Sequence, residues 1–172
     1  CGGILGITRA EVEIEHCLNT GTITSTEPAA LRFGGILGIT AGKDFTATIR
    51  DCLSAGRITA ANSRVGAVLS EVGANTNVKM VDVYATIESL SDGKNYINKA
   101  IGHMTNDNVK IDGSGVLLPE IELLGTNAYR WTNLNFEKFW AAKANKTPEL
   151  LKFTTGNNLS VAGIQKLADI SW

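Results

Sequence analysis

Residues of the types that carry catalysis or bind metals are scarce in this 172-residue chain. It contains two histidines, His16 and His103, and neither has a partner at a spacing typical of zinc ligands. No Gly-x-Ser-x-Gly sequence is present that would place a nucleophilic serine on a sharp turn. We therefore expect no catalytic residue, no metal site and no cofactor, and the sequence identifies no ligand-binding residue.

Two stretches resemble ligand-binding loops but differ from them at critical positions. Gly2–Gly6 is glycine-rich, yet it lacks the Lys-Ser/Thr pair and the following helix of a phosphate-binding loop. Asn106–Gly113 is rich in Asn and Asp, as calcium loops are. However, Lys110 and Ile111 fall where an EF-hand needs an oxygen ligand and a glycine. An EF-hand in this register is excluded, and only a looser surface calcium site remains open.

Three acidic residues are the best candidates for glycan cleavage. Glu11, Glu13 and Glu15 alternate with Val12 and Ile14, which places the carboxylates on one face of a strand. A glycosidase acid needs a pKa raised by burial, whereas carboxylates on an alternating exposed face are normally solvated. A carbohydrate-active enzyme of the β-helix type, either a polysaccharide lyase or a glycoside hydrolase, is therefore the alternative and not the leading interpretation.

These residues lie within an internal repeat. Gly2–Thr8 recurs letter for letter as Gly34–Thr40, and Cys17–Thr24 is matched by Cys52–Thr59. Weaker third and fourth copies follow, in which Val83 takes the place of the cysteine. We expect four copies, at about residues 1–33, 34–64, 65–98 and 99–128.

The sequence pattern of each copy predicts short strands and not helices. In the first two copies, apolar and polar residues alternate with a period of two, and Gly, Asn, Thr or Ser separates the apolar runs. We predict an all-β fold, a β-solenoid of about four coils with three short strands per coil, with a β-propeller or a sandwich as the alternative. Gly21 and Gly56 are expected at sharp corners, where glycine tolerates positive φ.

Equivalent cysteines in adjacent coils would lie close together. Strands in a ladder are about 4.8 Å apart, so Cys17 and Cys52 would fall within the Cα range of a disulfide. The favoured interpretation is an interior ladder of small apolar thiols, with a disulfide as the alternative. Cys1 aligns with Phe33, inside a copy, which indicates that the chain is part of a longer polypeptide rather than a lipid-modified terminus.

Composition narrows the class of partner. With 16 Lys and Arg against 17 Asp and Glu, the chain has a net charge of −1, which argues against binding to nucleic acid. No apolar run is long enough to span a bilayer. A threonine row that includes Thr22, Thr24 and Thr59 could form an ice-binding face, but the later copies do not preserve it.

The repeat resembles a known family. Gly-Gly-Ile-Leu-Gly followed by Cys-Leu-Asn-Thr-Gly-Thr-Ile-Thr, within Gly2–Thr24, is similar to the GLUG-type repeat of bacterial surface proteins, which also occurs in immunoglobulin A1 peptidases. The match is strong over Gly2–Thr24 and Gly34–Thr59 and weak from Val65 to about Asn127. The aromatic residues beyond it are similar to the segment that often closes such arrays. Leu18 and Leu53 depart from the aromatic residue usual in that family. The resemblance implies a repetitive extracellular region and carries no catalytic residue with it.

The aromatic residues gather near the C-terminus. Phe136, Phe139 and Trp140 are spaced to form one apolar face, so we predict that residues 129–153 form a cap over the end of the solenoid, with a carbohydrate-binding platform as the alternative. For residues 154–172 we expect a helical tail over Val161–Asp169, N-capped by Ser160, or the start of a further module.

Together these features predict a non-catalytic repeat module of a bacterial cell-surface or secreted protein. It would act as a stalk or as an adhesion surface, with a host glycan or an extracellular protein as the possible partner. No nucleic acid and no membrane-spanning segment is expected.

Overall fold

The computed structural model describes residues 1–25, 32–60, 64–91, 99–105, 109–153 and 156–166. Most elements in these residues are strands, and the two α-helices have four and five residues. The predicted all-β class is therefore confirmed. The larger sheets are parallel, and no sheet in the described part of the chain closes on itself.

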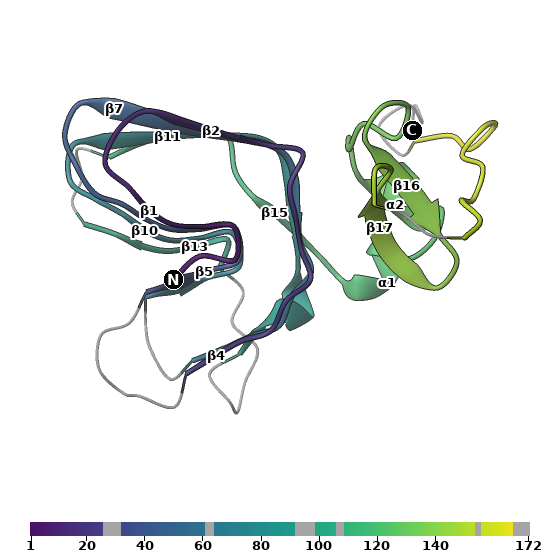
Figure 1. Cartoon of the computed structure of the whole chain (residues 1–172), viewed down its shortest axis with the longest axis horizontal. Helices are drawn as coiled ribbons and strands as arrows, with labels where there is room; N and C mark the ends of the chain where they lie inside the picture. Colours follow the sequence, from purple (N-terminus) through teal and green to yellow (C-terminus); the bar gives the residue numbers. More distant parts are fainter. Residues whose placement is uncertain (26–31, 61–63, 92–98, 106–108, 154–155, 167–172) are drawn as a thin grey trace, which may run out of the picture.

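Three parallel sheets form a stack from residues 1–118 (Figure 1). The first contains β1 (Leu5–Thr8), β6 (Leu37–Thr40), β10 (Leu69–Val72) and β13 (Ile101–Met104). The second contains β2 (Val12–Glu15), β3 (Leu18–Asn19), β7 (Phe45–Ser54), β11 (Thr76–Thr86), β14 (Lys110–Asp112) and β15 (Val116–Leu118). The third contains β4 (Ile23–Ser25), β8 (Ile58–Ala60) and β12 (Leu90–Ser91).

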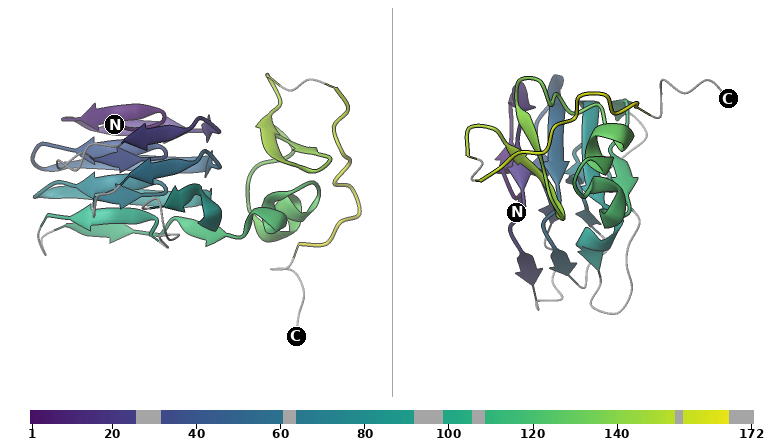
Figure 2. Two further views of the ribbon diagram at one scale, coloured as in Figure 1. Left: turned by 90° about the horizontal axis from the view of Figure 1, so that it is seen from below. Right: turned by 90° about the vertical axis from the view of Figure 1, so that its right-hand side faces the viewer.

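Shorter elements complete the stack. The strands β5 (Phe33–Gly34) and β9 (Val65–Gly66) pair in parallel, and the 3-10 turn η1 (Ile87–Ser89) precedes β12. Successive copies of the repeat lie on one another as layers, which Figure 2 shows from the side. We number these layers 1 to 4 from the N-terminus.

Equivalent residues of successive copies are paired in the sheets. Leu5 pairs with Leu37, Leu37 with Leu69, and Leu69 with Ile101. Val83 pairs with Cys52, as the alignment of the weak third copy requires. The register of the sheets thus matches the alignment read from the sequence, even where few identical residues remain.

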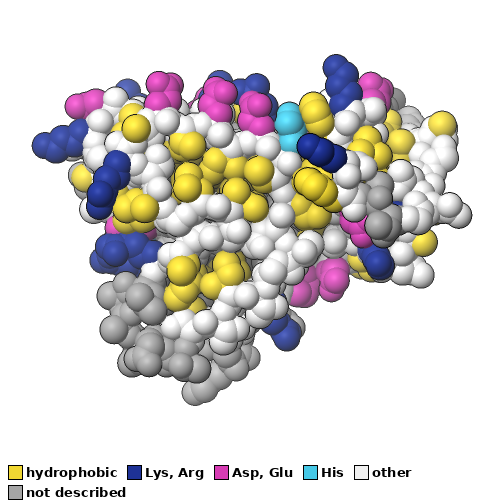
Figure 3. Space-filling model, in the orientation of Figure 1, with side chains coloured by type: hydrophobic (Ala, Val, Ile, Leu, Met, Phe, Trp, Pro, Cys, Tyr) yellow, Lys and Arg dark blue, Asp and Glu magenta, His cyan; other side chains and the backbone are white. Residues whose placement is uncertain are grey.

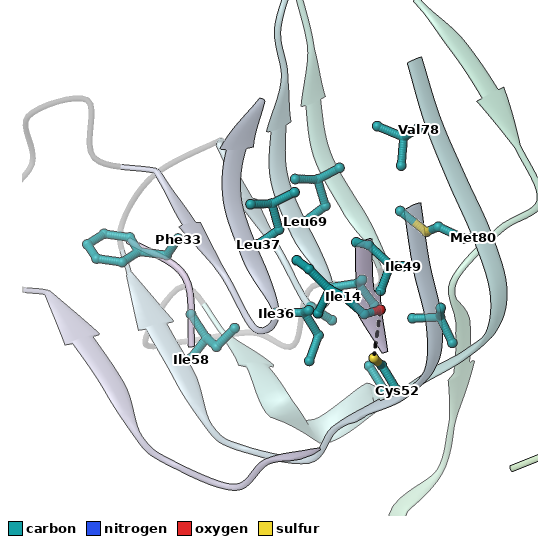
Figure 4. Packing of buried hydrophobic residues seen from close by; sticks show 14 of the residues in the cluster. Ile14, Phe33, Ile36, Leu37, Ile49, Cys52, Ile58, Leu69, Val78 and Met80 are labelled. Carbon is teal, nitrogen blue, oxygen red and sulfur yellow. Dashed lines mark hydrogen bonds between the residues drawn. The ribbon is translucent and has the colours of Figure 1, made fainter. Parts of the chain in front are cut away.

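The interior of the stack is narrow and built from Ile, Leu and Val. Ile14, Ile49 and Met80 of the second sheet face Leu37 and Leu69 of the first (Figure 4). Buried residues of all three sheets belong to this one cluster. Branched aliphatic residues fill most of this pleated surface, together with the aromatic ring of Phe33.

The corners differ from the prediction. Neither Gly21 nor Gly56 is among the described residues with positive φ. The left-handed corner is instead made by His16, Asp51 and Asp82, with φ between 48° and 54°. Asp and Asn enter this region more readily than most residues with a Cβ, because their short side chains can bond locally.

The glycine at position 56 is needed for a different reason. A Cβ on Gly56 would lie 2.2 Å from the Gly21 carbonyl oxygen in the layer above. Glycine therefore permits close approach of two backbones, and its freedom of φ is not used here.

A C-terminal segment, residues 119–166, lies beside the stack (Figures 1 and 2). It contains α1 (Glu120–Leu123), α2 (Asn127–Trp131) and an antiparallel pair, β16 (Trp140–Lys143) and β17 (Lys146–Leu150). Residues 120–128, assigned to the fourth copy from the sequence, pack with this segment: Leu123 and Ala128 share a cluster with Trp140.

The prediction that residues 129–153 cover the end of the stack is wrong. Their apolar cluster includes Leu53, Tyr84 and Leu118, one residue from each of layers 2, 3 and 4. The segment therefore packs along the side of the layers. The backbone N–H of Asn133 also donates to the Tyr84 hydroxyl at 2.8 Å.

The predicted helix over Val161–Asp169 is absent from its described part, residues 161–166, and Asp169 and Trp172 lie outside the described residues. The Ser160 hydroxyl does accept the Ala162 N–H at 3.3 Å, as an N-cap would. However, Gly163 has a φ of 77°, which breaks a helix at its first turn. Among the described helices, none has the length and apolar character needed to cross a membrane.

The tight stacking predicts a different outcome for two equivalent glycines. A Cβ on Gly38 would lie 2.2 Å from the Gly6 carbonyl oxygen, whereas a Cβ on Gly6, in the outermost layer, meets nothing within 4 Å. Gly38→Ala should lower the free energy of unfolding by about 2 kcal/mol. Gly6→Ala should be neutral or slightly stabilising, because alanine reduces the entropy of the unfolded chain. Urea unfolding measures both, and an equal effect of the two variants would contradict this stacking.

Candidate functional site

The densest polar cluster described between the stack and the C-terminal segment is centred on Asp51. This residue occupies the left-handed corner of layer 2 and is 5% exposed. Its Oδ2 accepts the indole Nε1–H of Trp140 at 2.7 Å, and its Oδ1 accepts the backbone N–H of Asn135 at 2.9 Å. Both donors belong to the C-terminal segment, so one buried carboxylate holds that segment against the stack.

The imidazole of His16 completes this cluster. Its Nδ1 lies 2.7 Å from Asp51 Oδ2, and its ring stacks on Phe139 with the centroids 3.6 Å apart. The side chain packs on the C-terminal segment, and 31% of it remains exposed. A histidine oriented by a buried carboxylate is also a common catalytic arrangement.

Catalysis by this pair would need a nucleophile within reach. The thiol nearest in sequence, Cys17, donates instead to the Glu15 carbonyl oxygen at 3.2 Å. It packs against the interior cluster of the stack, whereas His16 contacts Phe139 of the C-terminal segment. The histidine and the thiol are thus directed to different neighbours. The contacts of His16 and Asp51 connect the C-terminal segment to the stack, and we call them the joint.

An apolar groove opens beside this joint. It has a volume of about 200 Å³ and is lined by His16, Lys138, Phe139, Leu150, Leu151, Lys152 and Phe153. Figure 3 shows hydrophobic side chains and basic side chains together beside a histidine. Phe153 is 74% exposed, and Lys152 Nζ lies 6.0 Å from the centre of its ring. We call this surface the junction groove.

The charged side chains that line the junction groove are basic. Among the described residues, Lys138 and Lys152 line it and no carboxylate does. The carboxylate of Asp51 lies behind His16 and is occupied by its three donors. The groove can therefore accommodate an apolar group that carries a negative charge nearby. A second groove, of about 370 Å³, is lined by both signs of charge, with Glu120, Glu149 and Lys146.

The two interior cysteines are free thiols, as the favoured interpretation of the sequence had them. The hydrogen bond with Cys52 lowers the pKa of the Cys17 thiol to about 7, against the opposing effect of burial, and nearby His16 adds to the lowering. The same hydrogen bond and burial raise the pKa of the Cys52 thiol. The two sulfurs therefore differ strongly in reactivity.

The carboxylates suggested for glycan cleavage stand apart from the Asp51 cluster. Glu11 and Glu13 are exposed, as expected, and Glu15 lies 3.3 Å from the Arg50 guanidinium. The sequence analysis missed a different carboxylate, Glu71, which is buried. Its Oε2 lies 2.6 Å from Arg32 Nε and 3.0 Å from Arg64 Nη1.

A signal for Glu71 was present in the repeat. Glu71 pairs with Ile39, which itself pairs with Ile7, so a charged residue stands in a slot that isoleucine fills in the earlier copies. A buried charge at such a position requires a partner. Arg32 and Arg64 supply it from the chain just before β5 and β9, and their contact with Glu71 could not be read from spacing alone.

The structure gives no support to the looser calcium site. Asn106–Asn108 lie outside the described residues, and Asp112 is exposed and 3.7 Å from Lys79. In the described residues, no three side chains of His, Cys, Asp or Glu come together in a group able to hold a metal ion. His103 is half-buried on β13, where it pairs with Glu71.

The cluster predicts that Asp51 stabilises the protein more than its equivalent in layer 3. Asp82 has the same left-handed backbone, but among the described residues its side chain makes no hydrogen bond to the C-terminal segment. Asp82→Ala therefore measures only the cost of placing alanine in this backbone conformation. Asp51→Ala should destabilise the chain by roughly 2 to 4 kcal/mol more, because it leaves the Trp140 indole N–H buried without an acceptor. Urea unfolding of both variants gives the difference, and equal values would show that the joint contributes nothing.

We compared the chain with known proteins by sequence and by structure. No family model, no curated protein and no solved structure matches the chain. The likeness to GLUG-type repeats therefore rests on the residues quoted above, and the function has to be argued from the stack, the joint and the groove.

Proposed function

We propose that the chain is a β-solenoid module of about four coils that works without catalysis, as a stalk or an adhesion surface of a bacterial cell-surface or secreted protein. The parallel register supports the solenoid, because equivalent residues pair over the first 118 residues. Propeller blades and most sandwiches consist of antiparallel strands and would not give this pairing. The extracellular bacterial context rests on the resemblance to GLUG-type repeats.

The observation that carries the non-catalytic proposal is that groups suited to catalysis are committed to structural contacts. His16 and Asp51 bind each other and the C-terminal segment. The buried carboxylate of Glu71 is held by Arg32 and Arg64. A β-helix enzyme would instead present a carboxylate to a polysaccharide bound in a groove.

Of the two kinds of partner, the junction groove favours a protein over a glycan. Its apolar lining consists of Phe139, Leu150, Leu151 and Phe153, and its polar lining residues are His16, Lys138 and Lys152. Glycan sites need many hydrogen-bonding groups, whereas an apolar groove of this kind suits an apolar side chain next to an acidic residue. We therefore propose that the adhesion surface is centred on this groove.

Removing one exposed ring tests the proposal. The purified chain is applied to immobilised extracellular-matrix proteins and to a glycan array, and its binding is measured by surface plasmon resonance. Binding to a matrix protein is expected, and Phe153→Ser should weaken it about tenfold, as loss of an aromatic anchor does. Ile121→Ser is the matched control, since Ile121 is 64% exposed but does not line the groove.

Other results would redirect the proposal. Binding to glycans that is unaffected by Phe153→Ser would exclude the junction groove as the adhesion surface. If the chain binds neither the matrix proteins nor the glycan array, only the proposed role as a stalk remains. Depolymerisation of a polysaccharide that persists through purification would overturn the non-catalytic proposal in favour of the β-helix enzyme.

A further inference from the structure

Cys17 of layer 1 and Cys52 of layer 2 are neighbours in the stack. Leu18 pairs with Leu53 in the parallel ladder, which places the two cysteines in register immediately before that pair. The Cys17 backbone N–H donates to Cys52 Sγ at 3.4 Å, so the second sulfur lies directly against the first residue. Neighbouring strands are about 4.8 Å apart, within the Cα separation that disulfides span.

The surroundings of the two thiols are unequal. Cys52 is fully buried in the core cluster, and Figure 4 shows its sulfur directed toward the Ile14 carbonyl oxygen, 3.6 Å away. Cys17 lies at the edge of that cluster and is only half-buried. A small reagent from solvent therefore reaches Cys17 first, and Cys52 only through Cys17.

We propose that Cys17 and Cys52 form a dithiol site that a low-molecular-weight disulfide, such as oxidised glutathione, converts into a disulfide between layers 1 and 2. This inference is independent of the proposed adhesive function. It also differs from a permanent structural bridge, since both thiols are free in the structure.

The exchange balances without a further reactant. The Cys17 thiolate attacks one sulfur of oxidised glutathione, forms a mixed disulfide and releases one glutathione thiolate, which takes up the proton that Cys52 loses. The Cys52 thiolate then attacks the Cys17 sulfur and releases the second glutathione as thiolate. Two protein thiols are oxidised, and one glutathione disulfide is reduced to two glutathione molecules.

The ionisation of the thiols suits this order of events. With a pKa of about 7, Cys17 is substantially thiolate at neutral pH and acts as the attacking sulfur. Cys52, whose pKa is raised, is unreactive toward solvent but lies in place to resolve the mixed disulfide. Val83 fills the same slot in layer 3, so the pair has no third thiol beneath it.

The test uses the full chain with Cys1→Ser, because Cys1 is exposed and would react by itself. The folded protein is incubated with oxidised glutathione at neutral pH, and its free thiols and intact mass are measured. Both thiols should be lost, with a mass decrease of two hydrogens and no retained glutathione. Peptide mapping should recover a Cys17–Cys52 cross-link.

Cys52→Val in the same background is the matched variant. Valine already occupies this slot in layer 3, so the fold is expected to tolerate it. Cys17 should then retain glutathione as a stable mixed disulfide, since no resolving thiol remains. If the chain without Cys52→Val also stops at the mixed disulfide, or if both thiols stay free while the urea-unfolded chain reacts, the proposal is overturned.

Discussion

The parallel ladder between successive layers is the constraint on which the rest of the structure depends. Each paired strand residue lies directly over its equivalent in the next copy, so a side chain shapes the surroundings of its counterpart. Isoleucine stacks on isoleucine in the interior, and glycine meets a neighbouring backbone where layers come closest. A residue that breaks the pattern, such as Glu71, must bring partners with it.

The left-handed corner shows how one backbone requirement creates a second role. The slot of His16, Asp51 and Asp82 needs a residue that tolerates positive φ, and Asp meets that need. Among the described residues of this slot, only Asp51 of layer 2 accepts hydrogen bonds from Trp140 and Asn135. Asp51 therefore has two roles: its backbone forms the left-handed corner, and its carboxylate binds the C-terminal segment.

Much of the stack could be predicted from sequence because its information is local and repeated. The pairing of Leu5 with Leu37 follows from two identical runs, and the placement of Val83 under Cys52 follows from spacing. The aromatic segment could not be placed in this way. Its partners, Leu53, Tyr84 and Leu118, come from three layers, and none of them differs in type from an ordinary core residue.

Two predictions about local structure, the glycine corners and the C-terminal helix, were wrong for physical reasons. Gly56 was predicted to be a corner residue, but the close approach of the Gly21 backbone is a second reason for the absence of a Cβ there. The apolar spacing after Ser160 suggested a helix, yet Gly163 adopts a left-handed φ and ends the turn. The Asp51 cluster was missed because its members are far apart in sequence: Asp51 and its donor Trp140 alone are separated by 89 residues.

The sideways position of the C-terminal segment also has a mechanical consequence. Layers joined only by main-chain ladders can slide or tilt past one another when a load acts across the stack. The segment touches layer 1 through His16, layer 2 through Asp51, layer 3 through Tyr84 and layer 4 through Leu118. It thereby acts as a brace, and shearing any layer against the next would strain contacts of several layers at once.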